Sequence, residues 1–410
     1  MEILPFIYLG YMFISLYMLV LFLFIYLKNR KTLFDYPEAK KKYSVSFIVP
    51  AYNEGKTIEE ALKHILEIDY DNILEIIVVN DCSTDNTREV VEKMMRKYKK
   101  IKLINNPKNL GNAARSQNVG LKHAKGEIIA VVDADSFPAK DSIRKMAGFF
   151  DEPKVGAVTC PVLARNQEKF IEKLQALEYQ TISFTRKLLE YIDSIYVTPG
   201  PLALYRREAI LEIGGFDEDN LTQDIESTWN LTYHGWDRKM SLSTNVTSQV
   251  PSKWKVWALQ RRRWNIGGMQ CIKKYWRNIG KKQMLGYFII PLFVIGLFWG
   301  LLGIGIFGYL FLSKVFSNLL MTGYAIQTGV PIITMDEIYI TPSILNYLVV
   351  SLFVFELIFL LIMLSVLKNK ILKKENLLNI PVYLIVYLMV YPFLMIDSMW
   401  QYFRGKRNWR

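Results

Sequence analysis

The sequence predicts an α/β domain with a mainly parallel sheet, combined with α-helical transmembrane segments. Between residues 44 and 250, short runs of β-branched residues alternate with charged helical stretches, as in β-α repeats around a parallel sheet. Other stretches are apolar and match the roughly 20 residues that cross a hydrocarbon core. These stretches are 5–27, 285–313, 344–367 and 378–402.

The composition favours a membrane over nucleic acid as the partner of the basic residues. The formal net charge is +13, and 51% of the residues are hydrophobic. A positive chain can bind nucleic acid or the anionic cytoplasmic face of a membrane. Because the basic residues flank apolar segments, we expect membrane lipid and no nucleic acid as a partner.

The first segment, 1–30, is expected to be an uncleaved transmembrane helix. No basic stretch precedes its apolar run and no A-x-A-like cleavage site follows, which disfavours a signal peptide. Lys28, Arg30 and Lys31 follow the apolar run directly. By the positive-inside rule, this end and the domain at 44–250 face the cytosol, in a multi-pass protein of the cell membrane.

Within the domain, strands and helices are predicted in alternation. The strands are Val45–Pro50, Ile73–Asn80, Ile101–Ile104 and Ile128–Asp133, and the helices are Ile58–Leu66, Thr87–Tyr98 and Ala113–Ala124. In such sheets, ligands bind beyond the carboxyl ends of the strands. The polar clusters of the sequence fall at those ends.

Residues 251–283 mix aromatic and basic side chains and predict an amphipathic helix in the membrane interface. A soluble helix with a basic face is the alternative. A transmembrane region of about three segments is expected over 284–403, with an external loop near 314–343. The basic tail at 404–410 is left unassigned to either side of the membrane.

Carboxylates and other polar side chains follow three of the predicted strands. Tyr52 and Glu54 follow the first, Asp81 the second, and Asp133 and Asp135 the fourth. Two carboxylates at i and i+2 repel each other unless a cation lies between them. With three cysteines and three histidines in no metal-binding spacing, a metal site would use oxygen ligands, which Mg²⁺ and Mn²⁺ prefer.

Two further clusters lie downstream. Asp224 is interpreted either as a helix N-cap or as a general base that takes a proton from an attacking hydroxyl. In the run from Gln260 to Trp264, Arg263 can hold phosphate oxygens, and Trp264 can stack on a sugar ring.

In this order, the clusters resemble the family 2 glycosyltransferases, and more narrowly the processive membrane-bound branch that makes poly-N-acetylglucosamine, hyaluronan, chitin and cellulose. The matching motifs are PAYNE at 50–54, NDCSTD at 80–85, DAD at 133–135, GPLALYRR at 200–207, TQD at 222–224 and QRRRW at 260–264. The resemblance implies a GT-A-like nucleotide-sugar-binding domain.

The resemblance also implies a role for each matching residue. The donor-binding residues would be Ala51, Tyr52, Glu54, Asp81, Asp133, Ala134 and Arg263. Asp135, with Asp133, would bind Mn²⁺ or Mg²⁺, and Asp224 would be the catalytic base. The acceptor-binding residues would be Gly200, Pro201, Gln260 and Trp264.

Three positions depart from the family pattern. The usual TED is TQD here, which keeps the base, and the usual glycine of the second motif is Cys82. A family lysine is replaced by Asn112, and Arg115 is the candidate substitute for it.

The expected function is inverting transfer of a hexose or N-acetylhexosamine from a nucleotide sugar, with UDP as the implied carrier, to a growing β-linked polysaccharide. Transfer of a single sugar to a membrane lipid is the alternative among enzymes. A catalytically inactive sugar-binding subunit is the alternative of another class, and the four aspartates Asp81, Asp133, Asp135 and Asp224 argue against it.

Overall fold

The computed structural model describes residues 4–328, 344–367 and 379–405. The chain divides into two compact units. One consists of Ile25–Phe293 with Asp397–Arg410 and contains the α/β domain, and the other consists of Met1–Phe24 with Val294–Ile396.

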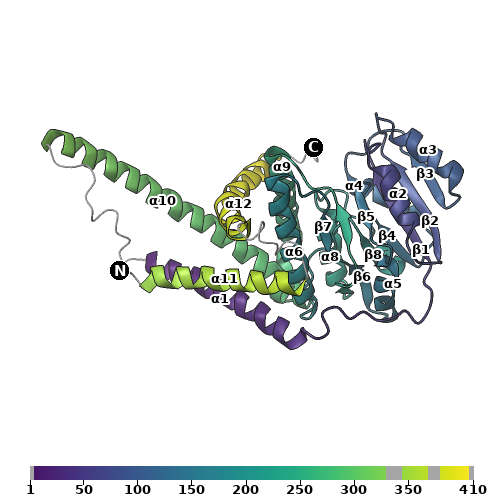
Figure 1. Cartoon of the computed structure of the whole chain (residues 1–410), viewed down its shortest axis with the longest axis horizontal. Coiled ribbons are helices and arrows are strands. Elements are labelled where there is room, and N and C mark those ends of the chain that lie inside the picture. The colour runs from purple at the N-terminus through teal and green to yellow at the C-terminus, as the bar shows by residue number, and fades with distance from the viewer. Residues whose placement is uncertain (1–3, 329–343, 368–378, 406–410) are drawn as a thin grey trace. The chain divides into compact units, whose positions relative to one another are not determined.

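The α/β domain is built on a seven-stranded sheet with the order β3-β2-β1-β4-β8-β6-β9 (Figure 1). β1 pairs in parallel with β2 and β4, β2 pairs in parallel with β3, and β8 runs antiparallel to β4 and β6. The strands are β1 Val45–Ala51, β2 Ile73–Asn80, β3 Ile101–Asn105, β4 Ile128–Val131, β6 Val155–Thr159, β8 Ala203–Arg206 and β9 Asp237–Met240. The mainly parallel sheet is therefore confirmed.

Alternate residues of β1 face two different layers of the core. Phe47 and Val49 pack with Leu62 of α2 (Ile58–Leu66) on one face of the sheet. Ile48 packs on the other face with Leu121 of α4 (Ala113–His123). Period-two alternation places successive side chains on opposite faces. With both faces covered, ligands have access at the strand ends.

The predicted elements of this half agree closely with the structure. The helix at Ile58–Leu66 and the strand at Ile73–Asn80 have the predicted bounds, and α3 covers Thr87–Lys97. The fourth strand ends at Val131, two residues before the predicted end at Asp133. There the amide of Ser136 donates to the carbonyl of Asp133 at 3.0 Å, so the chain turns out of the sheet.

The remaining elements of the domain complete the edge that carries the site. A second, three-stranded sheet has the order β5-β10-β7. Its strands are β5 Ser136–Pro138, β7 Val162–Ala164 and β10 Val246–Ser248. The helices are α5 Ser142–Ala147, α6 Phe170–Glu190, α7 Arg207–Glu212, α8 Gln223–Tyr233 and α9 Trp254–Tyr275.

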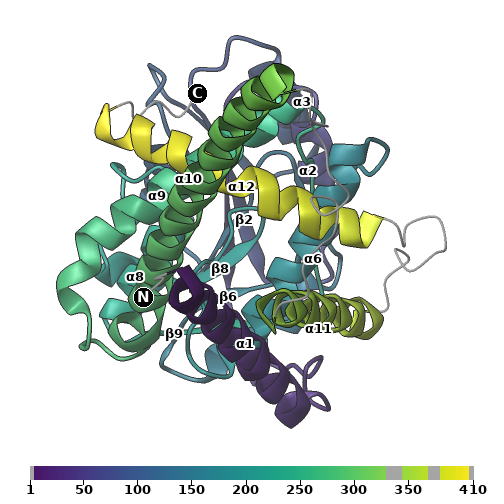
Figure 2. The same ribbon diagram turned by 90° about the vertical axis from the view of Figure 1, so that its left-hand side faces the viewer.

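Three helices are long and apolar enough to span a membrane: Pro5–Asn29, Leu285–Thr328 and Asn379–Phe403 (Figure 2). They belong to α1 Leu4–Asn29, α10 Ile290–Thr328 with the π-helical turn Leu285–Ile289 before it, and α12 Asn379–Phe403. α11 covers Ile344–Val366, of which Val350–Val366 forms a shorter apolar helix. These helices make the chain a membrane protein.

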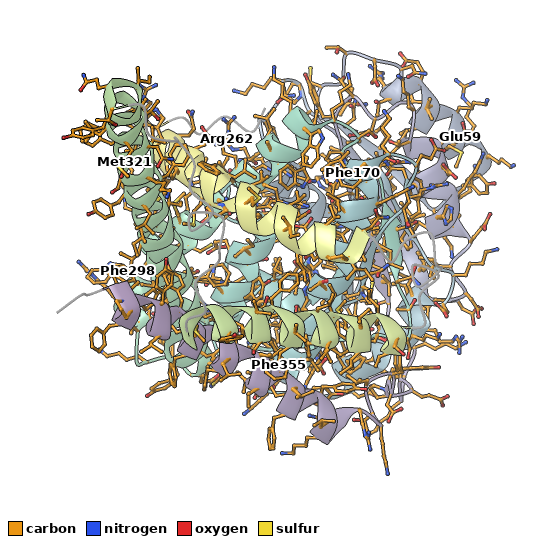
Figure 3. The ribbon with its side chains drawn as sticks, turned by 60° about the vertical axis from the view of Figure 1, so that its left-hand side comes forward. Glu59, Phe170, Arg262, Phe298, Met321 and Phe355 are labelled. Carbon is orange, nitrogen blue, oxygen red and sulfur yellow. The ribbon has the colours of Figure 1, made fainter. Side chains whose placement is uncertain are left out.

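The segment predicted at 285–313 proves longer, because α10 continues to Thr328. The loop expected at 314–343 is therefore wrong in its first half, and its second half lies outside the described residues. At 1.5 Å per residue, the 44 residues of Leu285–Thr328 extend about 66 Å. Phe298 and Met321 of α10 and Phe355 of α11 project from their helices as exposed apolar side chains (Figure 3), which suits lipid.

The interfacial segment predicted at 251–283 forms α9, followed by a short 3₁₀ turn at Trp276–Asn278. Trp254 and Trp276 are exposed, whereas Trp257 and Tyr275 are buried. Tyr275 packs against Trp229 and Tyr233 of α8, with ring centroids 6.0 and 6.1 Å away. Some of the aromatic side chains of α9 therefore belong to the core of the domain. That the exposed ones lie in the membrane interface stays a prediction.

Candidate active site

Hydrogen bonds join the loops that follow β1 and β2. The amide of Asn53 donates to Oγ of Ser83 at 3.0 Å, and the amide of Thr84 donates to Oδ1 of Asn53 at 2.8 Å. Asn53 and Cys82 have positive φ angles, 57° and 58°. This left-handed region favours glycine and tolerates asparagine. The backbone at Cys82 thus has a conformation that suits the glycine of the family pattern at this position.

Asp81, predicted to bind the nucleoside, forms hydrogen bonds with the loop that follows β3. It is only 5% exposed, and its Oδ1 accepts from Nδ2 of Asn106 at 2.8 Å and from the amide of Leu110 at 3.0 Å. Its own amide donates to the carbonyl of Ala51 at 2.8 Å. Asp81 therefore organises the loop after β3, and Asn106 is a partner that the sequence interpretation missed.

Tyr52 is half-buried directly after β1, and Glu54 follows it. Oε2 of Glu54 accepts from Oγ1 of Thr57 at 2.9 Å, which ties the carboxylate to the start of α2. The amide of Glu54 donates to Oγ1 of Thr87 at 2.8 Å. Glu54 is held at the strand edge and adds its negative charge to the field around Asp133.

Asp133, Ala134 and Asp135 occupy the turn after β4. Ala134 is buried between the two acids. Oδ1 of Asp135 accepts from Oγ of Ser136 at 3.2 Å, and the side chain of Ser248 on β10 is a second hydrogen-bond partner. The turn places both carboxylates directly after the end of β4.

Gly200 lies directly against Asp133. A Cβ atom on Gly200 would lie 3.0 Å from Oδ2 of Asp133. A side chain there would crowd the carboxylate, so glycine permits the approach of the two loops. Pro201 follows and is half-buried. The motif predicted at the acceptor entrance thus adjoins the predicted diphosphate and metal site.

Asp224 lies in the first turn of α8, after the N-cap Thr222. The N-cap interpretation of Asp224 is therefore wrong. Its Oδ1 accepts from the amide of Ile225 at 3.0 Å, and a carboxylate in the first turn interacts favourably with the helix dipole. α8 is fixed against α9 because Glu226 accepts from Nζ of Lys274 at 2.6 Å and from Oη of Tyr275 at 2.7 Å.

Arg263 of α9 joins the acids from different segments into one electrostatic cluster. Its charge interacts with those of Asp224, Asp133 and Asp135. Burial raises the pKa of Asp133 well above its ordinary value, and the charges of Asp135 and Asp224 raise it further, while Arg263 opposes the shift. The structure therefore brings together the predicted diphosphate, metal and base residues.

Burial likewise raises the pKa values of Asp135 and Asp224, with Arg263 acting against both shifts. The charges of four carboxylates, including Glu54, thus act on one another at this site. Such a concentration of negative charge is unfavourable without a bound cation.

The three consecutive arginines of the QRRRW motif have three different environments. Arg261 is wholly buried and ion-paired with Glu178 of α6. Arg262, labelled in Figure 3, meets Oδ2 of Asp397 at the end of α12 at 3.3 Å. Arg263 faces the acidic cluster. Of the three arginines, Arg263 is therefore the one whose charge acts on the predicted diphosphate and metal residues, which supports its assignment to the donor diphosphate.

The outer residues of the motif are held by Arg261. Oε1 of Gln260 accepts from Nη1 of Arg261 at 2.8 Å. The guanidinium carbon of Arg261 lies 4.0 Å from the ring centroid of Trp264, whose ring also faces Tyr179 at 6.5 Å. Both predicted acceptor-binding side chains therefore depend on a buried ion pair for their positions.

α6 supplies three residues that sequence reasoning missed: Glu178, Tyr179 and Arg186. Tyr179 acts electrostatically on Arg263, and Arg186 interacts with the charge of Asp224. α6 carries no strand-end motif. The buried positions of α6 also include polar residues such as Glu172, Gln175 and Lys187, so no pattern in the sequence singles out Glu178 or Arg186.

The two departures near α4 have structural explanations. Asn112 caps α4, with its Oδ1 accepting from the amide of Arg115 at 3.0 Å. Arg115 donates to the carbonyl of Leu110 at 2.9 Å and pairs with Glu218 at 3.4 Å. Both side chains are engaged within the domain, which gives no support to Arg115 as a phosphate ligand.

The donor set suits a hard divalent cation. Asp133 and Asp135 offer carboxylate oxygens next to Ser136 and Ser248, with no sulfur or imidazole ligand among them, and oxygen ligands select Mg²⁺ or Mn²⁺. Within residues 4–328, 344–367 and 379–405, no group of three acidic, histidine or cysteine side chains is arranged to hold a metal. The protein offers two carboxylates for this purpose.

Comparison with known families assigns the domain. Residues 46–214 match the model of glycosyl transferase family 2. This segment is a family 2 glycosyltransferase domain. The matched range of the family 2 domain covers β1 to β8 and includes Asp133, Asp135 and Gly200, while Asp224 and α9 follow it.

The family 2 domain has curated relatives named poly-β-1,6-N-acetyl-D-glucosamine synthase. The protein from Staphylococcus epidermidis is 28% identical over 260 residues, which are 62% of this chain and 61% of the relative. The protein from Staphylococcus aureus strain COL is 29% identical over 262 residues, 62% of each. The match spans about three fifths of the length of these relatives. The resemblance to the polysaccharide synthases is confirmed.

Among solved structures, the chain is similar to the mannosyltransferase PcManGT from Pyrobaculum calidifontis, determined in complex with GDP-Man and Mn²⁺. The similarity has a TM-score of 0.62 at 20% identity, and it covers 98% of this chain and 99% of that chain. The GT-A-like fold expected for the family 2 domain is confirmed.

Proposed function

We propose that the chain is an inverting membrane glycosyltransferase that transfers a hexose or N-acetylhexosamine from a nucleotide sugar, a UDP-sugar, to a growing β-linked polysaccharide. The observation that carries the proposal is the cluster of Asp133, Asp135, Asp224 and Arg263 at one edge of the sheet. The names of the curated relatives support a polysaccharide as the product.

On the donor side, Tyr52, Glu54 and Asp81 face the nucleoside, and Arg263 binds the diphosphate. The diphosphate approaches Asp133 and Asp135, whose charges would repel it. Mn²⁺ or Mg²⁺ held by these two carboxylates would neutralise the leaving diphosphate. Arg263 contributes further stabilisation where negative charge develops.

On the acceptor side, Asp224 accepts the proton of the attacking hydroxyl. The acceptor oxygen forms a bond to the anomeric carbon while the bond from that carbon to the diphosphate oxygen breaks, and the diphosphate leaves with the electron pair. A single displacement converts an α-linked donor into a β-linkage. Trp264 stacks on the acceptor sugar, next to Gln260 and the Gly200–Pro201 loop.

The proposed location is the cell membrane, with several spans and the family 2 domain in the cytosol. Lys28, Arg30 and Lys31 at the end of α1 support this orientation through the positive-inside rule. The exposed Trp254 and Trp276, among basic neighbours, support contact of α9 with membrane lipid.

The test is incubation of the purified full chain with a panel of labelled UDP- and GDP-sugars and either cation, followed by sizing of the product. A ladder of long chains from one UDP-sugar is the expected result. One labelled glycolipid would instead support the lipid acceptor. Absence of transfer with every donor, from protein that binds a donor, would favour the inactive sugar-binding subunit.

The matched variant is Asp224→Asn, which keeps the size and hydrogen bonding of the side chain. Its turnover should fall by about 10²- to 10⁴-fold, the usual contribution of a general base, while donor binding measured by calorimetry stays unchanged. Wild-type turnover in this variant would refute the base assignment.

A further inference from the structure

Arg186 is a buried charge in α6 that none of the family motifs includes. It is 5% exposed, and within the described residues neither Nε nor Nη1 of its guanidinium has a hydrogen-bond partner. A buried guanidinium is costly unless it is paired and hydrogen-bonded. Such a group in a well-packed domain therefore calls for an explanation beyond packing.

The ionisable groups that act on Arg186 are Tyr196, Asp224 and Cys160. Burial raises the pKa values of both Tyr196 and Cys160, which favours their neutral forms. Asp224 is the one carboxylate of the three. Among the described ion pairs none joins Arg186 directly to Asp224, so in this structure the cation acts on the carboxylate through its charge.

Asp224 thus has two cations near it, and they come from different helices. Arg263 belongs to α9 and Arg186 to α6, and both helices are labelled in Figure 1. Arg263 also interacts with Asp133 and Asp135, on the side where the proposed diphosphate binds. Within the part of the chain that the structure describes, the groups that act on Arg186 include neither of those two acids. The two arginines are therefore not equivalent.

This difference has a consequence during transfer. Once a donor diphosphate binds Arg263, its negative charge neutralises much of the positive charge of the guanidinium. Arg263 then attracts the carboxylate of Asp224 less strongly. Arg186 then remains as the cation that can hold the carboxylate. Its free N–H groups are suited to hydrogen bonding with a carboxylate oxygen, since such charge-assisted bonds are the strong ones.

We propose that Arg186 is a positioning residue, which orients the Asp224 carboxylate toward the acceptor hydroxyl while Arg263 is engaged by the donor diphosphate. This inference rests on the proposed function, because it requires Asp224 to act as the base. Arg186 touches neither sugar nor metal in this arrangement and acts through Asp224.

The first experiment compares Arg186→Met and Arg186→Lys in the purified full chain. Arg186→Met should lower kcat by about 100-fold, as for a misplaced catalytic group, with the KM and Kd for the donor within about twofold of wild type. Arg186→Lys keeps the positive charge, and its kcat should be about tenfold higher than that of Arg186→Met. A kcat within about threefold of wild type in Arg186→Met, or a parallel loss of donor binding, would overturn the proposal.

Arg238 is the matched control. It is another buried arginine, 3% exposed, but it donates to the carbonyls of Trp236 and Asp193 at 2.7 and 2.6 Å. Arg238→Lys should leave kcat per folded molecule unchanged. If Arg186→Met does not fold, Arg186→Lys decides: a reduced kcat at unchanged donor Kd supports positioning, and a wild-type kcat refutes it.

The double variant Asp224→Asn with Arg186→Met tests whether Arg186 acts through Asp224. Residues that act as one unit are non-additive, so removing Arg186 from the Asp224→Asn protein should change the residual rate by less than about twofold. A full further loss would refute the proposal while leaving the base assignment intact. Wild-type turnover in Asp224→Asn alone would refute the base assignment and, with it, this inference.

Discussion

The guanidinium of Arg261 is completely buried and donates to both carboxylate oxygens of Glu178, with Nε and Oε1 3.0 Å apart. The two residues lie 83 positions apart in the chain, one in α9 and the other in α6. This pair connects the helix of the QRRRW motif to the body of the domain, and it carries Gln260 and Trp264 with it.

Glu178→Ala should destabilise the domain by about 3–5 kcal/mol, because loss of one partner leaves the buried Arg261 charge uncompensated. The unfolding midpoint of the purified chain measures the effect. Glu59 provides the control, since its pair with Lys63 is exposed on the surface of α2 (Figure 3). Glu59→Ala should leave the midpoint unchanged. Equal effects of the two substitutions would contradict a special role for the buried pair.

Gly267→Ala should displace the segment that carries the base. A Cβ atom at Gly267 would lie 1.9 Å from Oγ1 of Thr222, two residues before Asp224. α9 and α8 would have to separate, and a shift of about 1 Å at a catalytic group costs about 100-fold in kcat.

The neighbouring glycine makes this prediction specific. A Cβ atom at Gly268 would meet its nearest atom, on Phe293, at 3.8 Å, which is an ordinary contact. Gly268→Ala should therefore keep near-wild-type kcat. Steady-state kinetics of the two variants decide the matter, and similar losses in both would exclude the steric explanation.

Asp135→Asn should stabilise the metal-free protein. Because the folded-state pKa of Asp135 is raised, its ionised form costs stability at pH values above the unfolded-state pKa, and asparagine removes that cost. In chelator at neutral pH, the unfolding midpoint should rise, by about 2–4 °C for each kcal/mol gained. The same variant should lose the stabilisation that Mn²⁺ gives the wild type.

Asp85→Asn is the control, because the pKa of Asp85 is shifted in the opposite direction to that of Asp135. The carboxylate of Asp85 accepts from the hydroxyl of Thr87 and from the amides of Gly55 and Thr87, the two amide bonds each at 3.0 Å, and these bonds lower its pKa. Its ionised form therefore stabilises the fold above the unfolded-state pKa, and its substitution should lower the midpoint. A fall in the midpoint of Asp135→Asn as well would show that the acidic cluster is not under electrostatic strain.

The pH dependence of kcat should reflect the raised pKa of Asp224. Burial raises this pKa above the ordinary value of 3.8, with Arg263 and Arg186 opposing the shift. A base works when ionised, so activity should decline as the pH falls through this pKa, at a higher pH than an ordinary aspartate would require. The measurement is kcat against pH under saturating donor, with folding monitored in parallel. An acid limb near the ordinary value would contradict the buried environment.

The parallel half of the sheet was predictable because the residues of each strand and helix specify that element without contacts from distant parts of the chain. Residues from Val45 to Val131 alternate between β-branched runs and amphipathic helices with polar ends, so order and bounds follow from the sequence. The antiparallel β8 and the short strands of the second sheet depend on contacts between distant segments. No local pattern specifies those contacts.

The site was predictable to the same extent. Asp133, Asp135, Asp224 and Arg263 belong to recognisable motifs, and the structure brings their charges together. Glu178 and Arg186 could not be found in this way, since their roles arise from partners 83 and 38 positions away. Residues that support a site through long-range contacts leave weak traces in a single sequence.

The left-handed turn at Cys82 has a practical consequence for chemical labelling. Cys82 is exposed in the loop beside the proposed nucleoside pocket, whereas Cys160 and Cys271 are buried and burial raises the pKa of each thiol. A maleimide reagent reacts with accessible thiolate, so it should modify the native chain at this one position. A fluorophore attached there would report donor occupancy without any engineered cysteine.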